Sequence, residues 1–168
     1  MTDHTPFPGI LTRAQALAAI RTGARPLPNL SRADLVGARL TGADLSGADL
    51  TRAYLYHACL TDARLSGADL AGANLSGADL TGADLRGAVL TDTDLSVADL
   101  TDANLANANL TDANLANANL TRANLANANL TRANLAGADL GGANHDKWTH
   151  WPDGYTPPVT ETTPEATA

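Results

Sequence analysis

The hydrophobic pattern of this chain has a period of five. Leucine falls on every fifth position from Leu30 to Leu140, which makes 23 consecutive five-residue units. On an α-helix five residues advance about 500°, so successive leucines would wind round the whole cylinder and form no apolar face. In a flat strand an odd spacing sends them to opposite faces of the sheet. The pattern therefore predicts neither a helix nor an ordinary strand.

A chain that turns through about 90° in each unit places every leucine inside a square coil, so that four units complete one turn. The residue two before leucine is alanine in every unit except those with Pro28 and Thr93, and it fills the rest of the interior. Residues 20 apart then lie above one another. Roughly six turns at about 4.8 Å give a rod a little under about 30 Å long. Thr93 is the polar exception, and its hydroxyl needs a backbone acceptor.

The outward positions also follow a rule. The residue before leucine is mostly Asp or Asn, and the last residue of each unit is often Gly or Asn, which suits a turn with positive φ. Because Arg52, Val97 and Arg122 also occupy that last position, we expect that not every corner has a positive φ. Threonines recur in one column and are expected to pair across coils; they are Thr41, Thr61, Thr81, Thr101 and Thr121.

A short helix is predicted before the repeats. Residues Thr12–Gln15 form a capping box, and Ala14, Leu17 and Ala18 recur at helical spacing before Gly23 ends the helix. A bare terminal coil would expose leucines and unpaired backbone groups. We therefore expect this helix to cover the first coil.

An aromatic segment follows the repeats. The leucine pattern stops at residues 145–155, which contain Trp148, Trp151 and Tyr155. Both tryptophans of the chain lie there, so we expect this segment to cover the last coil rather than to bind a ligand. Residues 156–168 have the composition of a disordered tail.

The stretches GADLSGADLTRAYL and DANLANANLTDANL resemble the pentapeptide-repeat family, whose consensus is A(D/N)Lxx. The resemblance covers residues 28–144. It implies an all-β solenoid, a right-handed quadrilateral β-helix. With the 23 units counted from the leucines, we predict this β-helix over 28–144, between an N-terminal segment at 1–27 and the C-terminal cap at 145–155. The handedness follows only from the resemblance. The close similarity of the units in 101–135 indicates recent duplication or assembly to a consensus.

Composition, charge and the absence of known motifs argue against several classes of function. The formal net charge of −7 argues against a surface that neutralises phosphates, and so against direct nucleic-acid binding. No apolar run reaches the roughly 20 residues of a membrane helix, and the opening MTDHTPFPG does not resemble a signal peptide, so we predict a cytoplasmic protein with no membrane contact. No phosphate loop, dinucleotide fingerprint or paired-cysteine metal motif is present. We predict no cofactor and no metal, and Cys59 is the single cysteine.

Two outward clusters are candidates for binding a partner. In the first, TRAYLYHACL at 51–60, Tyr54, Tyr56, His57 and Cys59 replace the usual small polar residues. Exposed aromatic side chains on a polar rod can anchor a protein partner. Drift at tolerant surface positions is the alternative.

The second cluster is an acidic belt in the middle coils, which includes Asp84 and has Arg86 as its one basic residue. Its candidate binding residues are Asp79, Asp92, Asp94, Asp99, Asp102 and Asp112. Residues 20 apart stack, so Asp79 meets Asp99 and Asp92 meets Asp112 at about 5 Å, where like charges repel modestly in water. The belt is either a binding surface or a source of solubility.

The leading functional prediction is a non-catalytic scaffold that presents the outward positions of a rod to an unidentified protein. The alternative, implied by the resemblance, is a DNA-mimicking modulator of DNA gyrase of the quinolone-protection type. Family members of that type usually have more phenylalanine at the central position, loops that interrupt the rod and a C-terminal pairing element. An enzyme is the third class, and it needs a pocket that a filled rod does not offer. A sealed end predicts a monomer or a weak homodimer.

Overall fold

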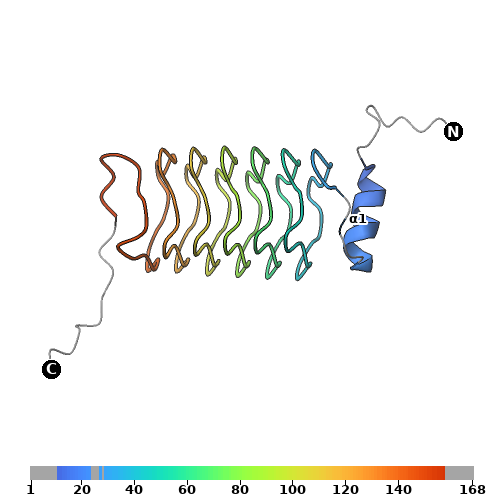
Figure 1. The fold of residues 1–168 in the computed structure, drawn as a ribbon, viewed down its shortest axis with the longest axis horizontal. Helices are drawn as coiled ribbons and strands as arrows, with labels where there is room; N and C mark the ends of the chain where they lie inside the picture. Colours follow the sequence, from blue (N-terminus) through green and yellow to red (C-terminus); the bar gives the residue numbers. More distant parts are fainter. Residues whose placement is uncertain (1–10, 24–26, 28, 158–168) are drawn as a thin grey trace, which may run out of the picture.

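The computed structural model describes residues 11–23, 27 and 29–157. The chain forms a rod of stacked coils with the helix α1, Arg13–Thr22, across one end (Figure 1). Neighbouring coils pair in parallel at a spacing of 20 residues, from the bridge Asp34↔Tyr54 to the bridge Asn124↔Asn144. Each edge of the square contributes a single bridging residue between two turns. The described coils are therefore joined by isolated parallel bridges, whereas the predicted β-solenoid suggested longer strands.

The core contains the residues that the five-residue period predicted. The central leucines Leu65, Leu70, Leu75 and Leu80 are at most 1% exposed. The alanines two before them are buried as well, which leaves room for one large side chain on each edge. The square coil is therefore confirmed.

Backbone hydrogen bonding explains the preference for Asp or Asn before leucine. In the unit 68–72, the N–H of Asp69 donates to the preceding coil, whereas those of Leu70 and Gly72 donate to the following coil. The N–H of Ala68 closes the turn onto the leucine carbonyl of the previous unit. The fifth N–H, on Ala71, donates to Oδ1 of Asp69 at 3.0 Å. An Asp or Asn side chain thus satisfies the one donor that the coil-to-coil ladder leaves over.

The expectation about the corners was wrong. Every unit's last residue from Arg32 to Gly142 has a φ between 56° and 70°, including Arg52, Val97 and Arg122. In each turn a leucine carbonyl accepts from the alanine N–H three residues later, and only the third turn residue has positive φ, which is the pattern of a type II turn. The geometry of the turn is common to all corners, so the side chain adapts to it.

The threonine hydroxyls were predicted correctly at the buried Thr93 but not in the column of stacked threonines. The hydroxyl of Thr93 donates to the carbonyl oxygen of Leu70 at 2.9 Å, which confirms the expected backbone acceptor. In the stacked column the hydroxyls bond to a thiol, carboxylate or amide side chain that precedes a leucine, and not to each other. Thr61 donates to Asp79 at 2.9 Å, and Thr121 likewise donates to the amide oxygen before its own leucine.

The helix α1 begins at the predicted capping box, in which the Gln15 N–H donates to the Thr12 hydroxyl, and ends at Gly23 with φ 63°. Its buried face differs from the prediction. Ala16 and Ile20 are buried, whereas Ala14 and Ala18 are exposed and Leu17 is partly buried. Burying the large aliphatic Ile20 removes more apolar area from water than burying two methyl groups, so it sets the rotation of the helix.

The C-terminal segment both continues the coil and covers it. His150 bridges Asn129 across 21 residues, so the ladder runs one unit past residue 144 with one residue inserted. Trp151 and Tyr155 pack against the core with ring centroids 5.3 Å apart, as expected of a cap. The prediction for Trp148 was wrong, because it is 60% exposed. The predicted tail lies, from residue 158 onward, outside the described residues.

Candidate functional site

One corner of the rod carries a column of charged residues with a gap in it. Residues 20 apart stack at this corner, and in order along the rod they are Arg32, Arg52, Gly72, Asp92, Asp112 and Arg132. We call this column the charge ridge. Two cationic residues come first, two anionic residues follow the gap, and Arg132 is last.

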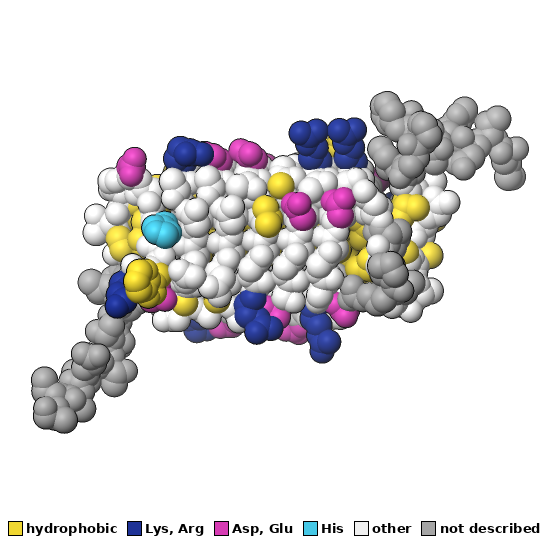
Figure 2. All heavy atoms as spheres, viewed as in Figure 1, with side chains coloured by type: hydrophobic (Ala, Val, Ile, Leu, Met, Phe, Trp, Pro, Cys, Tyr) yellow, Lys and Arg dark blue, Asp and Glu magenta, His cyan; other side chains and the backbone are white. Residues whose placement is uncertain are grey.

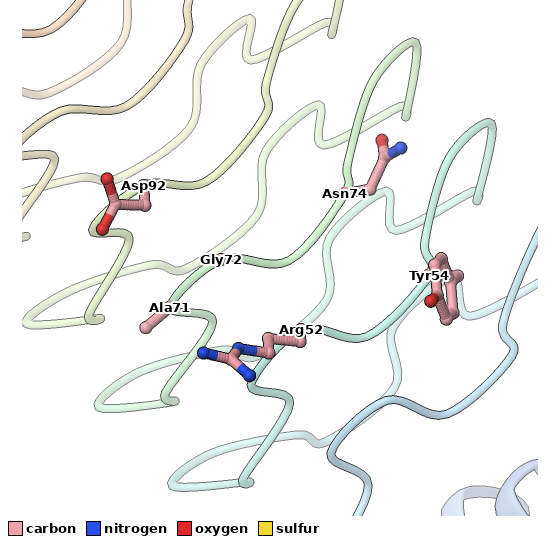
Figure 3. Close-up of a pocket in the computed structure, with 6 residues that line it drawn as sticks. All are labelled: Arg52, Tyr54, Ala71, Gly72, Asn74 and Asp92. Atoms are coloured by element: carbon pink, nitrogen blue, oxygen red, sulfur yellow. The ribbon is translucent and has the colours of Figure 1, made fainter.

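The gap in the charge ridge is a hollow of about 420 Å³. Gly72 and Ala71 form its floor because neither has a side chain beyond Cβ, and Tyr54 and Asn74 lie along one side. Figure 3 shows Arg52 and Asp92 on opposite sides of Gly72. A Cβ added to Gly72 would meet the Arg52 Cγ at 3.4 Å, an ordinary contact. The hollow therefore exists because the side chain is missing and not because the backbone moves apart.

The two charges that flank the hollow have no bonded partner within the described part of the rod, although the pKa of Arg132 is raised by its hydrogen bond to Asp112 and also by the charge of Asp92. Neither Arg52 nor Asp92 forms an ion pair or a hydrogen bond through its side chain with the described residues, and both are exposed. They lie two coils apart, which is about 10 Å at the spacing of β-strands. The hollow thus offers a cation and an anion at fixed separation, with a phenol and an amide along one side (Figure 3).

The predicted aromatic cluster is divided by the structure. Tyr54 is 52% exposed and lines the hollow. Tyr56 is 37% exposed, outside the hollow, with its ring in an edge contact with His57 at 5.9 Å between centroids. The thiol of Cys59 lies 3.2 Å from the Thr41 hydroxyl, and this hydrogen bond lowers the pKa of the thiol. Tyr54 is therefore the aromatic candidate that belongs to a hollow.

Three members of the predicted acidic belt are ion-paired. Asp84 lies 2.7 Å from Nη2 of Arg86 in its own unit. Nε of Arg122 donates to Asp102 and Nε of Arg132 donates to Asp112, each at 2.7 Å from the coil above. These hydrogen bonds lower the pKa of both carboxyl groups. The belt therefore includes arginines that the order of residues along the chain did not suggest.

Three other members bond to the rod itself. Asp79 accepts from the Thr81 N–H at 3.0 Å, and that bond is the first cause of its lowered pKa. Asp94 and Asp99 accept from the N–H groups two residues later, at 3.0 and 2.9 Å. Of the six candidate carboxylates, Asp92 alone has no hydrogen bond or ion pair with the described residues. Acidic and basic groups are interspersed along the visible face of the rod (Figure 2).

The sequence interpretation missed Arg52, Gly72 and Asn74. The predicted stacking considered pairs of carboxylates, such as Asp92 and Asp112, and not pairs of opposite charge. Arg52, Gly72 and Asp92 follow one another at a spacing of 20 residues, so a turn of four units places them in one column. Repeat register was therefore the signal that could have found the hollow.

Metal-binding groups and membrane-spanning helices are two other features that bear on function. The described residues contain no group of three or more His, Cys, Asp or Glu side chains that could hold a metal ion. No helix in the described part of the chain is long and apolar enough to cross a membrane.

A family profile described as pentapeptide repeats matches residues 29–67, 68–107, 98–135 and 108–144, in eight copies. The chain belongs to the pentapeptide-repeat family. The resemblance stated from the repeats is confirmed, and the stacked four-cornered coil is the β-helix of this family.

Solved structures of other family members are similar to the chain. A pentapeptide repeat protein, Rfr23, from the cyanobacterium Cyanothece 51142 is 47% identical over 55% of this chain and 63% of its own, with a TM-score of 0.55. HetL from Nostoc, involved in heterocyst differentiation regulation, is 35% identical over 76% of this chain and 69% of its own, with a TM-score of 0.49. The chain thus spans less than two thirds of the length of Rfr23.

Other solved structures are less similar to the chain. The fluoroquinolone resistance protein QnrB1 is 21% identical over 70% of this chain and 79% of its own, with a TM-score of 0.28. A comparison with curated proteins found no match.

Proposed function

We propose that this pentapeptide-repeat protein is a non-catalytic binding scaffold, and that a protein partner docks at the hollow over Gly72. The observation that carries the proposal is the free pair Arg52 and Asp92 on either side of that hollow, with the half-exposed Tyr54 beside it. Elsewhere on the middle coils the carboxylates of the belt are already bonded within the rod. Free charges and an exposed aromatic ring are the features that interfaces use.

The chemistry of the hollow favours a protein over other ligands. A phosphate polyanion would be repelled by Asp92, and the hollow is shallow and open, unlike the enclosed and largely apolar sites of small molecules. A protein surface can present an acidic group to Arg52 and a basic group to Asp92 at the same time. Complementary charge would then set the register of the partner along the rod.

The test is to fill the hollow without disturbing the fold. Gly72→Asn places a side chain over the floor, and asparagine already occupies positive-φ corners at Asn107 and Asn117. The matched control is Gly87→Asn, at a corner where an added Cβ meets nothing within 4 Å. Tyr54→Ala is the second variant. Quantitative capture from lysate should lose the same protein with Gly72→Asn and Tyr54→Ala and keep it with Gly87→Asn. Equal recovery by all four proteins would reject this site.

The alternative of a DNA-mimicking gyrase modulator rests on the acidic belt. Arg122 and Arg132 neutralise Asp102 and Asp112, which interrupts the lane of negative charge that such mimicry needs. A gyrase supercoiling assay tests it, since mimicry requires inhibition that weakens at higher salt. The cytoplasmic location stays a prediction.

A further inference from the structure

The charge ridge is complementary to itself in one orientation. Along the ridge the charges read positive, positive, none, negative, negative, from Arg32 through Gly72 to Asp112. Basic groups and, beyond a gap, acidic groups lie along the upper edge of the rod in Figure 2. A two-fold axis at Gly72 turns this series into its opposite.

The pairs that such an axis creates are specific. With two rods antiparallel and their ridges facing, Arg52 of each copy lies opposite Asp92 of the other. Arg32 lies opposite Asp112 of the other copy, where Arg132 is already bound. Each pair occurs twice, as in any two-fold interface between identical chains.

Other arrangements of the same ridges are unfavourable. Parallel rods in register place arginine against arginine and aspartate against aspartate. An antiparallel pair shifted so that Gly72 faces Asp92 places Arg32 against Arg132 of the other copy. A shift the other way, with Arg52 facing Gly72, keeps only the attraction between Arg32 and Asp92. Like charges that face each other across an interface are destabilising, so the antiparallel register centred on Gly72 has the most favourable set of pairs.

The missing side chains at Gly72 and Ala71 allow close approach at the centre. The two hollows face each other there, and a glycine at the crossing point lets two backbones come near. Tyr54 borders the hollow in each copy and adds apolar area to the contact. The free charges, the gap and the exposed ring thus lie together on one surface.

We infer that the partner at the hollow is a second copy of this chain, docked antiparallel through the charge ridge. This inference rests on the proposed function, because it names the protein that the same hollow binds. The dimer is weak, since exposed ion pairs contribute little each and two chains of net charge −7 repel. It also depends on salt, because the Debye length falls from about 30 Å at 0.01 M to about 3 Å at 1 M.

Sedimentation velocity over a wide range of protein concentration tests the inference. The wild type should dimerise at about 0.1 M salt, where a Debye length of about 10 Å already screens the repulsion between the two net charges. Its dissociation constant should be at least about ten-fold higher at 1 M salt, where the contacts across the ridge are screened as well. Arg52→Asp and Asp92→Arg each turn two attractions into repulsions and should weaken the dimer at least about ten-fold. The double variant, with both changes in one chain, restores the opposition of charges and should return to within about three-fold of the wild type.

Two controls match the single variants in charge. Arg39→Asp and Asp62→Arg change the same charges at exposed positions off the ridge, and their dimerisation should stay within about three-fold of the wild type. Corners already hold both arginine and aspartate at positive φ, so the ridge variants should fold, which circular dichroism checks.

A wild type that stays monomeric at about 0.1 M salt, or a double variant as weak as the single ones, overturns the inference. The proposed function is tested separately. If the wild type is monomeric while Gly72→Asn still loses a captured protein, the scaffold proposal stands with a different partner. If the wild type dimerises through the ridge and capture is unchanged by Gly72→Asn, the scaffold proposal fails for other proteins and the dimer remains.

Discussion

The hydroxyl of Thr93 donates to the carbonyl oxygen of Leu70 on the preceding coil at 2.9 Å, where the neighbouring core residues of the coils are leucine and alanine. Thr149 makes the same bond to Leu125 at 2.9 Å. The turn that ends at Thr93 is wider than the other turns that begin at a repeat leucine, with 3.3 Å from its amide nitrogen to the Leu90 oxygen against 2.9 to 3.1 Å in those turns. The buried hydroxyl thus compensates for a side chain larger than the usual alanine.

Replacing Thr93 by valine should therefore cost more than replacing it by alanine. Thr93→Val keeps the bulk that widens the turn and loses the hydrogen bond, whereas Thr93→Ala loses the bond and relieves the crowding. We expect the alanine variant to exceed the valine variant by at least about 1 kcal/mol in the free energy of unfolding. Urea denaturation of both variants measures the difference, and equal midpoints would contradict it.

Val97 is the corner residue whose type suits a positive φ least, because it is β-branched. Its φ is 59° and 66% of its surface is exposed. Val97→Asn should raise the free energy of unfolding by about 1 kcal/mol, since asparagine tolerates the left-handed region and little buried surface is lost. Val97→Ala is the control, because it keeps a Cβ at positive φ without the branch. It should gain less than the asparagine variant, and thermal denaturation of the two decides the order.

The carboxyl group of Asp79 makes stability depend on pH. The Thr81 N–H and the Thr61 hydroxyl donate to it, and its pKa is lowered from the usual 3.8. A depressed folded-state pKa gives stability that is present above the unfolded value and is lost as pH falls through the folded value. The free energy of unfolding should therefore decline below about pH 4.

The Asp79→Asn variant separates this group from the other carboxylates. Asparagine keeps the acceptor oxygen, as Asn119 shows in the next coil but one of the same column, and removes the titration. The variant should lose less stability than the wild type between about pH 5 and pH 2. Urea titrations across that range provide the measurement, and parallel curves for both proteins would contradict the assignment.

The period of five was enough to predict the square coil. Only a chain that turns once in each unit lets every central leucine, such as Leu65, point inward and be buried. The corner conformation was not predictable from residue preferences, since Val97 and Arg52 adopt a φ that neither favours. There the backbone ladder of the whole rod outweighs the preference of one residue. Local propensity was thus misleading where the long-range hydrogen bonds decide.

The candidate site was harder to predict because it depends on register between coils. Asp102 looks free along the chain, yet Arg122 reaches it from 20 residues away. The hollow arises from a missing side chain at Gly72, and a glycine at a corner is otherwise unremarkable in this sequence. Side-chain pairing at a spacing of 20 had to be seen in space before the free residues could be distinguished from the bound ones.

Val89 interrupts the column of side-chain acceptors, and its replacement tests why Asp and Asn recur before leucine. It lies between Asp69 and Asn109 in the ladder, and the N–H of Thr91 has no acceptor among the described residues. Val89→Asn supplies an amide oxygen at the position where Asn109 accepts from the Thr111 N–H at 3.1 Å.

The amide nitrogen of the new asparagine can also donate to Asp69 below, as Asn114 donates to Asp94 at 3.1 Å. Since each such bond contributes about 0.5 to 1.5 kcal/mol and some apolar contact is lost, the net gain in the free energy of unfolding should be about 1 kcal/mol. Val89→Ala is the control, because it removes the same side chain without an acceptor and should be destabilising. Equal urea midpoints for the asparagine and alanine variants would show that the side-chain acceptor does not stabilise the rod.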